Sequence, residues 1–538
     1  MPNRAYINWG KYLATQGDLD EAIKKFETSV FMINKIPEAY VNLGIAYANK
    51  LQYDLAIKNF KTATKLDRNY AKAFALWASA ALELNNPKEA EYLFKRANKL
   101  DPRDSEIYLN WAISLIKLQR KNEAHEKFKL ALFYNPNNYM ASFFWGISLM
   151  DDKNFKEAIA AFNYVLAYNN NDSECYFHIA VCHYQLKEFD KCIENAKKVL
   201  EINNKRAEAY VLLAEAYINN KDEQKAFEVY EKAEKICPSS VKLKLSKGMA
   251  LKNGQKYELA KEYFLQVLVE EVRNPIAMYN LALCELNLNN EEAGVNLLLN
   301  VIEIQPDNTD ALSNIGVYYC KHENYDKAIE FFQKAIKSSR NAKEIYFDIG
   351  NCYSLKKDMD NAIKYYEKCI EYVPKKIEAY INLASILIDK KNYKEALRKL
   401  NTAYKTDNNN IFVNHLYGIV NMKLGNYKEA NEKFEKALNL DINFKGAFIG
   451  YCESLIMLNK PKEVLGLLEN PKYEKYKDDL FLCTKSHIKL AYIEPSIYNI
   501  KEAERLIEEY TKTYPEDEWI QKEKTDFEDF VKTNKKGD

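Results

Sequence analysis

The chain has 538 residues, of which only 15 are Gly and 13 are Pro, each below 3% against usual frequencies of about 7% and 5%. So few turn-forming residues exclude a fold of many short strands, and 47% hydrophobic with 29% charged residues indicates a mostly helical chain. The net charge of +1 gives no field that would attract nucleic acid, and no run of 18 apolar residues predicts insertion into a membrane.

Small residues recur every 34 positions from the start of the chain to about residue 470. A second column of small residues follows 12 positions later, and a mostly aromatic column follows 4 positions after that. A period of this length is typical of a stacked repeat architecture. The first column consists of Gly10, Gly44, Ala78, Ala112, Gly146, Ala180, Ala214, Gly248, Ala282, Gly316, Gly350, Ala384, Gly418 and Cys452.

Each unit reads as a hairpin of two amphipathic helices, as residues 37–68 illustrate. Apolar residues recur at helical spacing in both halves of this segment, with polar residues between them. Gly44 and Ala56 carry almost no side chain, so the two helices approach closely, and Phe60 fills the space beside this contact. One hairpin cannot bury its apolar face alone, and neighbouring hairpins are therefore expected to stack.

The repeat pattern weakens locally and then decays toward the C-terminus. Lys244 and Lys247 stand where the eighth unit should be apolar, so we expect looser packing there. Fourteen repeats in one continuous solenoid are predicted over residues 3–470, and a diverged hairpin over 471–515 with a longer loop at Ile493 to Asn499. A capping helix, apolar on one side, is predicted over 516–532, and a frayed tail over 533–538.

In these columns the chain resembles the tetratricopeptide repeat family, whose period is 34 residues. The resemblance implies an all-α, right-handed superhelical solenoid of about fourteen to fifteen hairpins. It also implies that the first helix of each hairpin lines a concave groove that binds a peptide or a partner helix. We therefore expect a non-enzymatic scaffold or adaptor for protein or peptide partners. The alternative is a structural subunit of a larger complex, assembled through its ends and convex face.

One column on the expected groove face is rich in asparagine, although Asn is a poor helix former. A carboxamide has a donor and an acceptor, so a row of them can pair with the backbone of an extended peptide. This row is similar to the asparagine ladder in the repeat region of O-linked N-acetylglucosamine transferases, but no glycosyltransferase domain follows it. The alternative is that these residues only reflect an Asn-rich composition. The candidate groove residues are Asn8, Asn42, Asn110, Asn280, Asn314 and Asn382.

No motif for catalysis or for cofactor binding occurs in the sequence, and we expect no enzyme, no cofactor and no metal. Cys175, His178 and Cys182 share one helix face, where three such side chains could converge on zinc. However, the two cysteines occupy columns that hold Ala in other units, and Cys behaves as a small buried hydrophobe. Packing is therefore the preferred interpretation of this group.

The ten cysteines show no paired framework and the N-terminus shows no secretory signal, so a cytoplasmic location is expected. The first helix should expose the face that a preceding hairpin would cover. A homodimer through this uncapped N-terminal end is one expected consequence.

Overall fold

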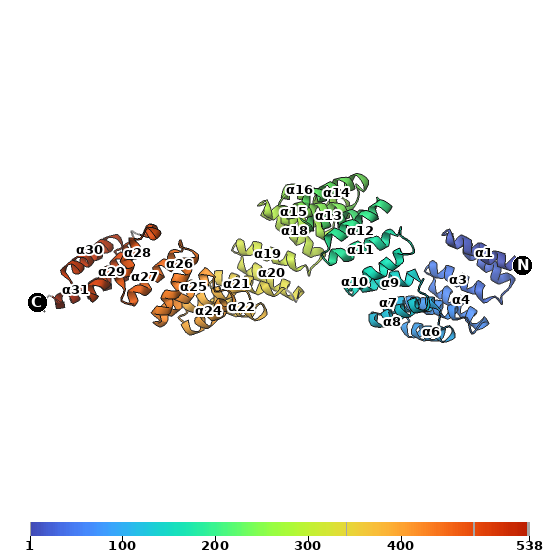
Figure 1. The fold of residues 1–538 in the computed structure, drawn as a ribbon, viewed down its shortest axis with the longest axis horizontal. Helices are drawn as coiled ribbons and strands as arrows, with labels where there is room; N and C mark the ends of the chain where they lie inside the picture. Colours follow the sequence, from blue (N-terminus) through green and yellow to red (C-terminus); the bar gives the residue numbers. More distant parts are fainter. Residues whose placement is uncertain (1, 340–341, 477–478, 535–538) are drawn as a thin grey trace. The chain divides into compact units, whose positions relative to one another are not determined.

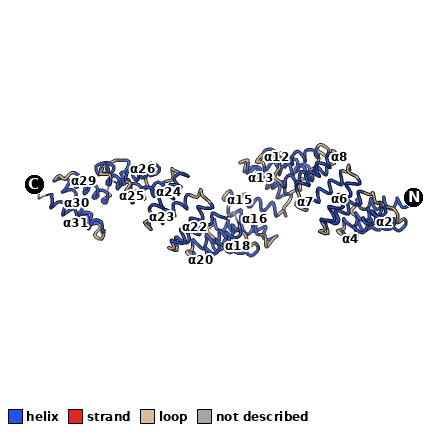
Figure 2. Tube along the Cα trace, turned by 90° about the horizontal axis from the view of Figure 1, so that it is seen from below, coloured by secondary structure: helices blue, strands red, loops and turns tan. Residues whose placement is uncertain are grey.

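The computed structural model describes residues 2–339, 342–476 and 479–534. Within these residues the chain forms α-helices joined by short loops, with two short 3-10 helices, η1 (Ala342–Glu344) and η2 (Pro471–Tyr476), and no strand (Figure 2). The all-α solenoid expected from the sequence is confirmed. No described helix is both long enough and apolar enough to cross a lipid bilayer.

The chain divides into two compact units, residues 1–272 and 273–538. Each unit is a stack of antiparallel helix pairs (Figure 1). The prediction of one continuous solenoid over residues 3–470 stays a prediction. The helices of the first unit are α1 (Pro2–Thr15), α2 (Leu19–Met32), α3 (Pro37–Asn49), α4 (Tyr53–Leu66), α5 (Ala71–Glu83), α6 (Pro87–Leu100), α7 (Ser105–Lys117), α8 (Lys121–Tyr134), α9 (Tyr139–Asp151), α10 (Phe155–Leu166), α11 (Ser173–Gln185), α12 (Phe189–Ile202), α13 (Ala207–Asn219), α14 (Glu223–Ile236), α15 (Val241–Asn253) and α16 (Tyr257–Glu270).

The second unit continues the same alternation of first (odd-numbered) and second (even-numbered) helices. Its helices are α17 (Pro275–Asn287), α18 (Glu291–Ile304), α19 (Thr309–Lys321), α20 (Tyr325–Ser338), α21 (Ile345–Leu355), α22 (Met359–Tyr372), α23 (Ile377–Asp389), α24 (Tyr393–Thr406), α25 (Ile411–Leu424), α26 (Tyr427–Leu440), α27 (Lys445–Met457), α28 (Pro461–Leu468), α29 (Leu480–Ile493), α30 (Ile497–Thr513) and α31 (Glu518–Asn534).

The close approach of the two helices in a hairpin depends on the small-residue column. A Cβ atom added to Gly44 would lie 2.6 Å from Cε1 of Phe60, and one added to Gly316 would lie 2.6 Å from Cε1 of Phe332. The two aromatic rings are almost completely buried, at 1% exposure each. The aromatic side chain therefore packs directly on the backbone of the facing helix, as the sequence predicted.

Every hairpin of the repeat turns through one residue in the left-handed backbone region, always at the same position of the unit. Only Gly17 and Gly425 meet this requirement with glycine, the residue that adopts positive φ without steric cost. The other twelve residues have φ between 57° and 63° and are Leu51, Asn85, Gln119, Lys153, Lys187, Lys221, Gln255, Asn289, Glu323, Lys357, Lys391 and Asn459.

Lys247 is buried at 8% exposure in α15, and its charge is compensated locally. Its Nζ lies 2.9 Å from Oε2 of Glu234 and 4.7 Å from the centroid of the Tyr263 ring. A buried cation needs such partners, because an isolated charge loses its hydration. The looser packing expected in this region stays a prediction, but the Lys247 side chain is buried and forms an ion pair with Glu234.

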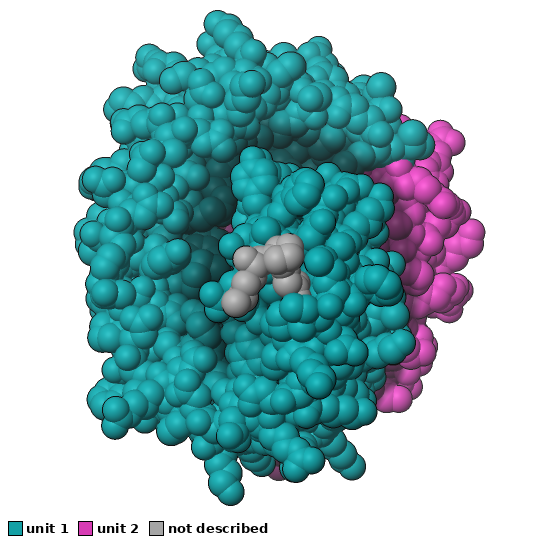
Figure 3. Space-filling view, turned by 90° about the vertical axis from the view of Figure 1, so that its right-hand side faces the viewer, with its two compact units in different colours: residues 1–272 teal, residues 273–538 magenta. Residues whose placement is uncertain are grey.

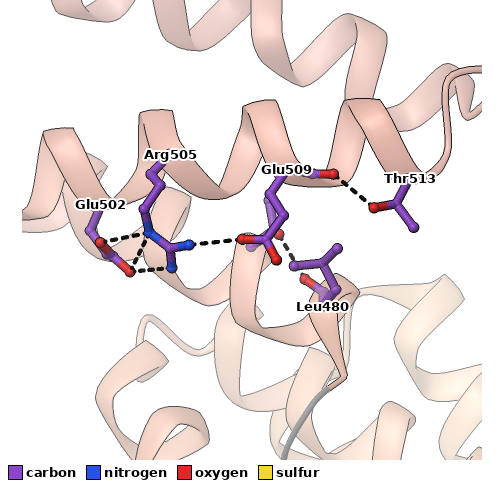
Figure 4. A network of polar contacts seen from close by, with 6 residues as sticks. Leu480, Glu502, Arg505, Glu509 and Thr513 are labelled. Atoms are coloured by element: carbon purple, nitrogen blue, oxygen red, sulfur yellow. Dashed lines mark hydrogen bonds and ion pairs between the residues drawn. The ribbon is translucent and has the colours of Figure 1, made fainter.

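The last hairpin, α29 and α30, has a shorter connection than the loop expected at Ile493 to Asn499. Helix α30 already begins at Ile497, because Oγ of Ser496 accepts a hydrogen bond from the backbone N–H of Asn499 at 3.1 Å and caps it. On its exposed face Arg505 pairs with Glu502 at 2.7 Å and Glu509 at 2.8 Å (Figure 4). The predicted capping segment forms α31, which buries Phe527. Residues 535–538 of the predicted tail lie outside the described residues.

Candidate peptide-binding groove

Figure 3 shows that the first unit is hollowed, its atoms curving around an open space. All six candidate asparagines lie on first helices, many of which contact the next first helix of the stack. Three belong to the first unit, on α1, α3 and α7, and three to the second unit, on α17, α19 and α23. The candidate groove residues therefore form two separate rows, one in each unit.

A single hydrogen bond recurs along the rows. The Nδ2 atoms of Asn42, Asn110 and Asn314 each donate to the backbone carbonyl four residues earlier, at 2.8, 2.9 and 2.8 Å. This bond holds the carboxamide in one orientation. The Oδ1 atoms of these three residues accept no hydrogen bond from a described residue, so each presents an acceptor that a ligand can use.

The bond itself does not distinguish the candidate groove from the rest of the molecule. Asn59 on α4 and Asn195 on α12 make the same bond at 2.8 Å, and both lie on second helices. It is the ordinary way for an asparagine inside a helix to satisfy its donor. Composition therefore explains the bond, and only position separates the candidate residues from the others.

The remaining candidates differ from one another. Asn8 is exposed, whereas Asn280 is buried at 6% exposure and donates to the carbonyl of Ile276 at 2.8 Å. Asn382 turns toward the preceding hairpin, where its Nδ2 donates to Oδ1 of Asn351 at 3.0 Å and to Oη of Tyr366 at 3.3 Å. Asn8 and Asn42 thus lie on first helices that contact each other, whereas Asn280 and Asn382 have roles in packing.

Beyond Asn110 the row of the first unit becomes aromatic, at Phe144 on α9 and His178 on α11. The His178 ring stacks on Phe162, with centroids 5.3 Å apart, and meets the edges of Phe143 and Phe177 at 5.8 Å. Burial lowers the pKa of His178, which favours the uncharged imidazole. Both residues belong to the same sequence column as the candidate asparagines, although the predicted groove residues were limited to the asparagines.

In the second unit Asp348 on α21 occupies the same column. Burial raises the pKa of Asp348 to about 6, an effect that Glu344 reinforces and the nearby Lys376 opposes. Its charge therefore changes in mildly acidic solution, unlike that of an exposed carboxylate. A carboxyl group in this position offers a peptide either an acceptor pair or a donor, depending on pH.

The cysteine and histidine group of α11 packs as small buried residues do. Cys175 and Cys182 are completely buried, and burial raises the pKa of each thiol to about 12. A thiol in this state stays protonated, whereas a zinc ligand must be a thiolate. Among the described residues no three His, Cys, Asp or Glu side chains are arranged to hold a metal ion.

A cavity of about 490 Å³ lies over α9, between the second helices α8 and α10. It is lined mainly by apolar groups, including the Trp145 ring, Leu149 and Ala161, with the carboxylate of Glu157 at its side. None of its lining residues is among the site residues predicted from the sequence. The signal was present in the aromatic column that contains Trp9, Trp77, Trp111 and Trp145.

Comparison with protein-family models identifies the repeat. Models described as tetratricopeptide repeat match residues 37–70, 109–174, 173–206, 207–240, 245–309 and 309–341. A model described as anaphase-promoting complex, cyclosome, subunit 3 matches residues 355–437. No curated protein matches the sequence.

Among solved structures, similar chains occur in a crystal structure of the APC/C hetero-tetramer Cut9–Hcn1 and in a human IFIT1 dimer with m7Gppp-AAAA. The first is 15% identical, with a TM-score of 0.37, covering 85% of this chain and 96% of its own. The second is 18% identical, with a TM-score of 0.41, covering 75% and 89%. Pseudomonas aeruginosa pilF is 20% identical over 38% and 94%, with a TM-score of 0.34. These TM-scores are too low to support an inference about function.

Proposed function

The chain is a tetratricopeptide repeat protein, and we propose that it is a non-enzymatic scaffold or adaptor that binds a peptide segment or partner helix along its first helices. Repeats of this kind form protein-interaction surfaces, and none of the matching models describes an enzyme. The observation that carries the proposal is the set of oriented carboxamides at Asn42, Asn110 and Asn314, whose oxygens accept no bond from described residues.

The interaction follows from the geometry of an extended peptide, whose backbone N–H groups are donors that require acceptors. Asn42, Asn110 and Asn314 supply such acceptors, and so does Asn8. Because the contact is to backbone, it is largely independent of the peptide sequence. Side-chain preference would then come from the aromatic stretch at Phe144 and His178, which favours an apolar residue in the ligand.

The test compares matched asparagine variants in a pull-down from cells that express the protein. The groove variant carries Asn42→Ala and Asn110→Ala, and the control carries Asn59→Ala and Asn195→Ala. Both lose two carbonyl bonds of 2.8–2.9 Å, so circular dichroism should show equal helicity and similar stability. We expect partners to fall by about fivefold or more from the groove variant alone, since each lost hydrogen bond contributes about 1 kcal/mol.

The same design applies to the second unit, with Asn314→Ala against Asn439→Ala, which removes an exposed asparagine from the second helix α26. Partners retained equally by the groove and control variants would contradict the groove proposal in that unit. Such a result would favour the second candidate, a structural subunit assembled through the ends and the convex face. The match of residues 355–437 to a subunit of a multi-protein complex supports this second candidate.

Self-association through the first hairpin is a further part of the proposal. Trp9 and Tyr12 on α1 are 51% and 62% exposed, an unusual amount of aromatic surface on one helix turn. We propose no nucleic-acid partner, because the charge is balanced. We also propose a reducing compartment such as the cytoplasm, in line with the free state of all ten cysteines.

A further inference from the structure

An aromatic residue of a first helix is covered by a lysine in several hairpins. The lysine follows the aromatic residue by 16 positions and reaches across from the second helix of the same hairpin. The distances from Nζ to the ring centroid are 4.2, 4.1 and 5.0 Å for Lys25 over Trp9, Lys127 over Trp111 and Lys433 over Tyr417. A cation over an aromatic face is attracted by the negative charge of the π-system.

A glutamate accompanies each of these pairs, 12 positions after the aromatic residue and one helical turn before the lysine. The three are Glu21, Glu123 and Glu429. Nζ of Lys25 lies 3.8 Å from Oε2 of Glu21. Burial lowers the pKa of Lys127, and the charge of Glu123 opposes this effect. The Lys25 ammonium group is thus held between an aromatic face and a carboxylate, whereas in the fourth hairpin Glu123 pairs with Arg120 at 2.6 Å.

The fifth hairpin, α9 and α10, has the aromatic residue and the glutamate but lacks the lysine. Trp145 and Glu157 stand in the two columns, and the position of the lysine is occupied by Ala161. Of the described residues, no cation lies over the Trp145 ring, and Glu157 forms no ion pair. In the third hairpin Lys61 of the preceding hairpin covers Trp77 instead, at 4.8 Å. The residue that corresponds to Lys61 for the fifth hairpin is Lys129 of the fourth hairpin, and it pairs with Glu126 at 2.9 Å.

The missing side chain leaves the cavity of about 490 Å³ described above. The Trp145 ring, Leu132, Leu149 and Ala161 contribute its apolar walls, and Glu157 is the single charged residue that lines it. The cavity therefore combines apolar walls with one exposed glutamate that forms no ion pair with a described residue. This combination matches the aliphatic stem and terminal ammonium of lysine.

We propose that this cavity is a binding site for a lysine side chain of a partner protein. The aliphatic carbons contact Leu132, Leu149 and Ala161, and the ammonium lies between the Trp145 ring and the Glu157 carboxylate. Within the chain Lys25 shows this arrangement, and Lys127 shows its aromatic half, over the Trp111 ring. A partner lysine would supply in the fifth hairpin the cation that Lys25 and Lys127 supply in the first and fourth hairpins.

The surroundings of the cavity favour a protein partner. Tyr164 lines it and Tyr168 lies beside Tyr164, with ring centroids 5.6 Å apart, and the two side chains are 36% and 53% exposed. Both hydroxyl groups donate to the loop before α9, to the carbonyl of Pro136 at 2.7 Å and to Oδ1 of Asn137. Fixed, exposed aromatic side chains of this kind are enriched at protein interfaces.

The site does not depend on the candidate groove. The cavity is bordered by the second helices α8 and α10. Phe144, the α9 residue in the column of the candidate asparagines, is not among its lining residues. A partner could therefore occupy both surfaces of the first unit or only one of them. The experiment below reports on the cavity alone.

The test uses the full chain with ¹⁵N-labelled tryptophan, whose five indole signals are followed by NMR. Nε1 of Trp145 is buried and has no hydrogen-bond partner among the described residues, so its signal is a sensitive reporter. The probes are lysine with both ends capped (Nα-acetyl-lysine N-methylamide) and the equally long but uncharged capped norleucine. Trp145→Phe assigns the signal.

We expect a saturable shift of the Trp145 signal with capped lysine, in the millimolar range, and an affinity at least about fivefold lower for capped norleucine. Glu157→Gln should weaken lysine binding toward the norleucine value. Equal binding of the two probes would overturn the proposal and identify a purely apolar cavity. The absence of any Trp145 response to capped lysine would also overturn it.

Two exchanges between hairpins complete the test. Ala161→Lys places a lysine in the fifth hairpin and should abolish the response of Trp145. Lys127→Ala removes the cation over the Trp111 ring and should give the Trp111 signal a response to capped lysine, weaker than that of Trp145 because Glu123 is paired with Arg120. A Trp145 response that persists in Ala161→Lys, with helicity unchanged by circular dichroism, would contradict the assignment of the cavity.

Discussion

At the scale of single residues, the column of candidate groove residues shows how burial decides what a polar side chain does. Asn42 and Asn110 have free acceptors, Asn280 is buried, and Asn382 bonds to the preceding hairpin. The same residue type in the same column of the repeat therefore serves different purposes. The sequence predicts the column but not the orientation of its members, because orientation depends on the side chains of the neighbouring hairpins.

Asp348 yields a pH-dependent prediction at this scale. Its pKa in the folded chain, about 6, lies above the usual value of 3.8, so folding favours the protonated form. The stability that this group contributes is present below pH 3.8 and is lost as the pH rises through 6. Asp348→Asn imitates the protonated carboxyl at every pH. We expect it to stabilise the chain by about 1–2 kcal/mol at pH 7, after allowance for partial exposure, and by almost nothing at pH 4.

Urea unfolding of both proteins at pH 4 and pH 7 measures this difference directly. Asp389→Asn, at an exposed position of α23, controls for the general loss of a negative charge. A stabilisation by Asp348→Asn that is equal at the two pH values would show that the buried charge is not its cause.

At the scale of helices and turns, the connection within each hairpin has the same backbone geometry in every repeat, although different residues form it. Fourteen turns pass through the left-handed region at the same position, and twelve of them do so with a side chain present. An L-residue in this conformation costs about 1 kcal/mol relative to glycine. The 34-residue period thus specifies the turn, while the residue at its centre is often a poor choice locally.

Lys221→Gly is therefore expected to stabilise the chain by about 0.5–1 kcal/mol, since glycine tolerates the φ of 62° found there. The control is Lys232→Gly, an equally exposed lysine in the interior of α14, which should destabilise by about 1 kcal/mol. Urea midpoints of the two variants against the unchanged chain provide the measurement. A loss of stability at Lys221→Gly would contradict the role assigned to the turn.

At the scale of the whole molecule, stability in a stack of hairpins is a sum of local terms and contacts between neighbours. Within the first unit each helix pair contacts its neighbouring pairs, and the main contacts between its described helices join helices of the same or adjacent hairpins. A defect in one hairpin should therefore remain close to its origin. This behaviour differs from that of a globular domain, in which one core connects all elements.

Phe60→Ala tests this expectation within the first unit. Phe60 is 1% exposed and packs on Gly44, so its removal leaves a cavity that costs about 3–5 kcal/mol. Hydrogen exchange should accelerate in α3 to α6 and remain unchanged in α11 to α14. Phe31→Ala, at a side chain that is 92% exposed, should leave both regions unchanged. Faster exchange throughout the unit would show that its hairpins unfold as one body.

The sequence by itself determined the period, the pairing of helices, the small and aromatic columns, and the absence of strands among the described residues. These features repeat every 34 residues and depend on contacts within one hairpin or with the next, so a linear pattern contains them. Only the tertiary structure decided which asparagines keep a free acceptor, how Lys247 is paired, and where the absence of a lysine at Ala161 opens a cavity beside Trp145. Each of these depends on whether a side chain from a facing helix fills a given space, and that is set by packing in three dimensions rather than by the order of residues along one helix.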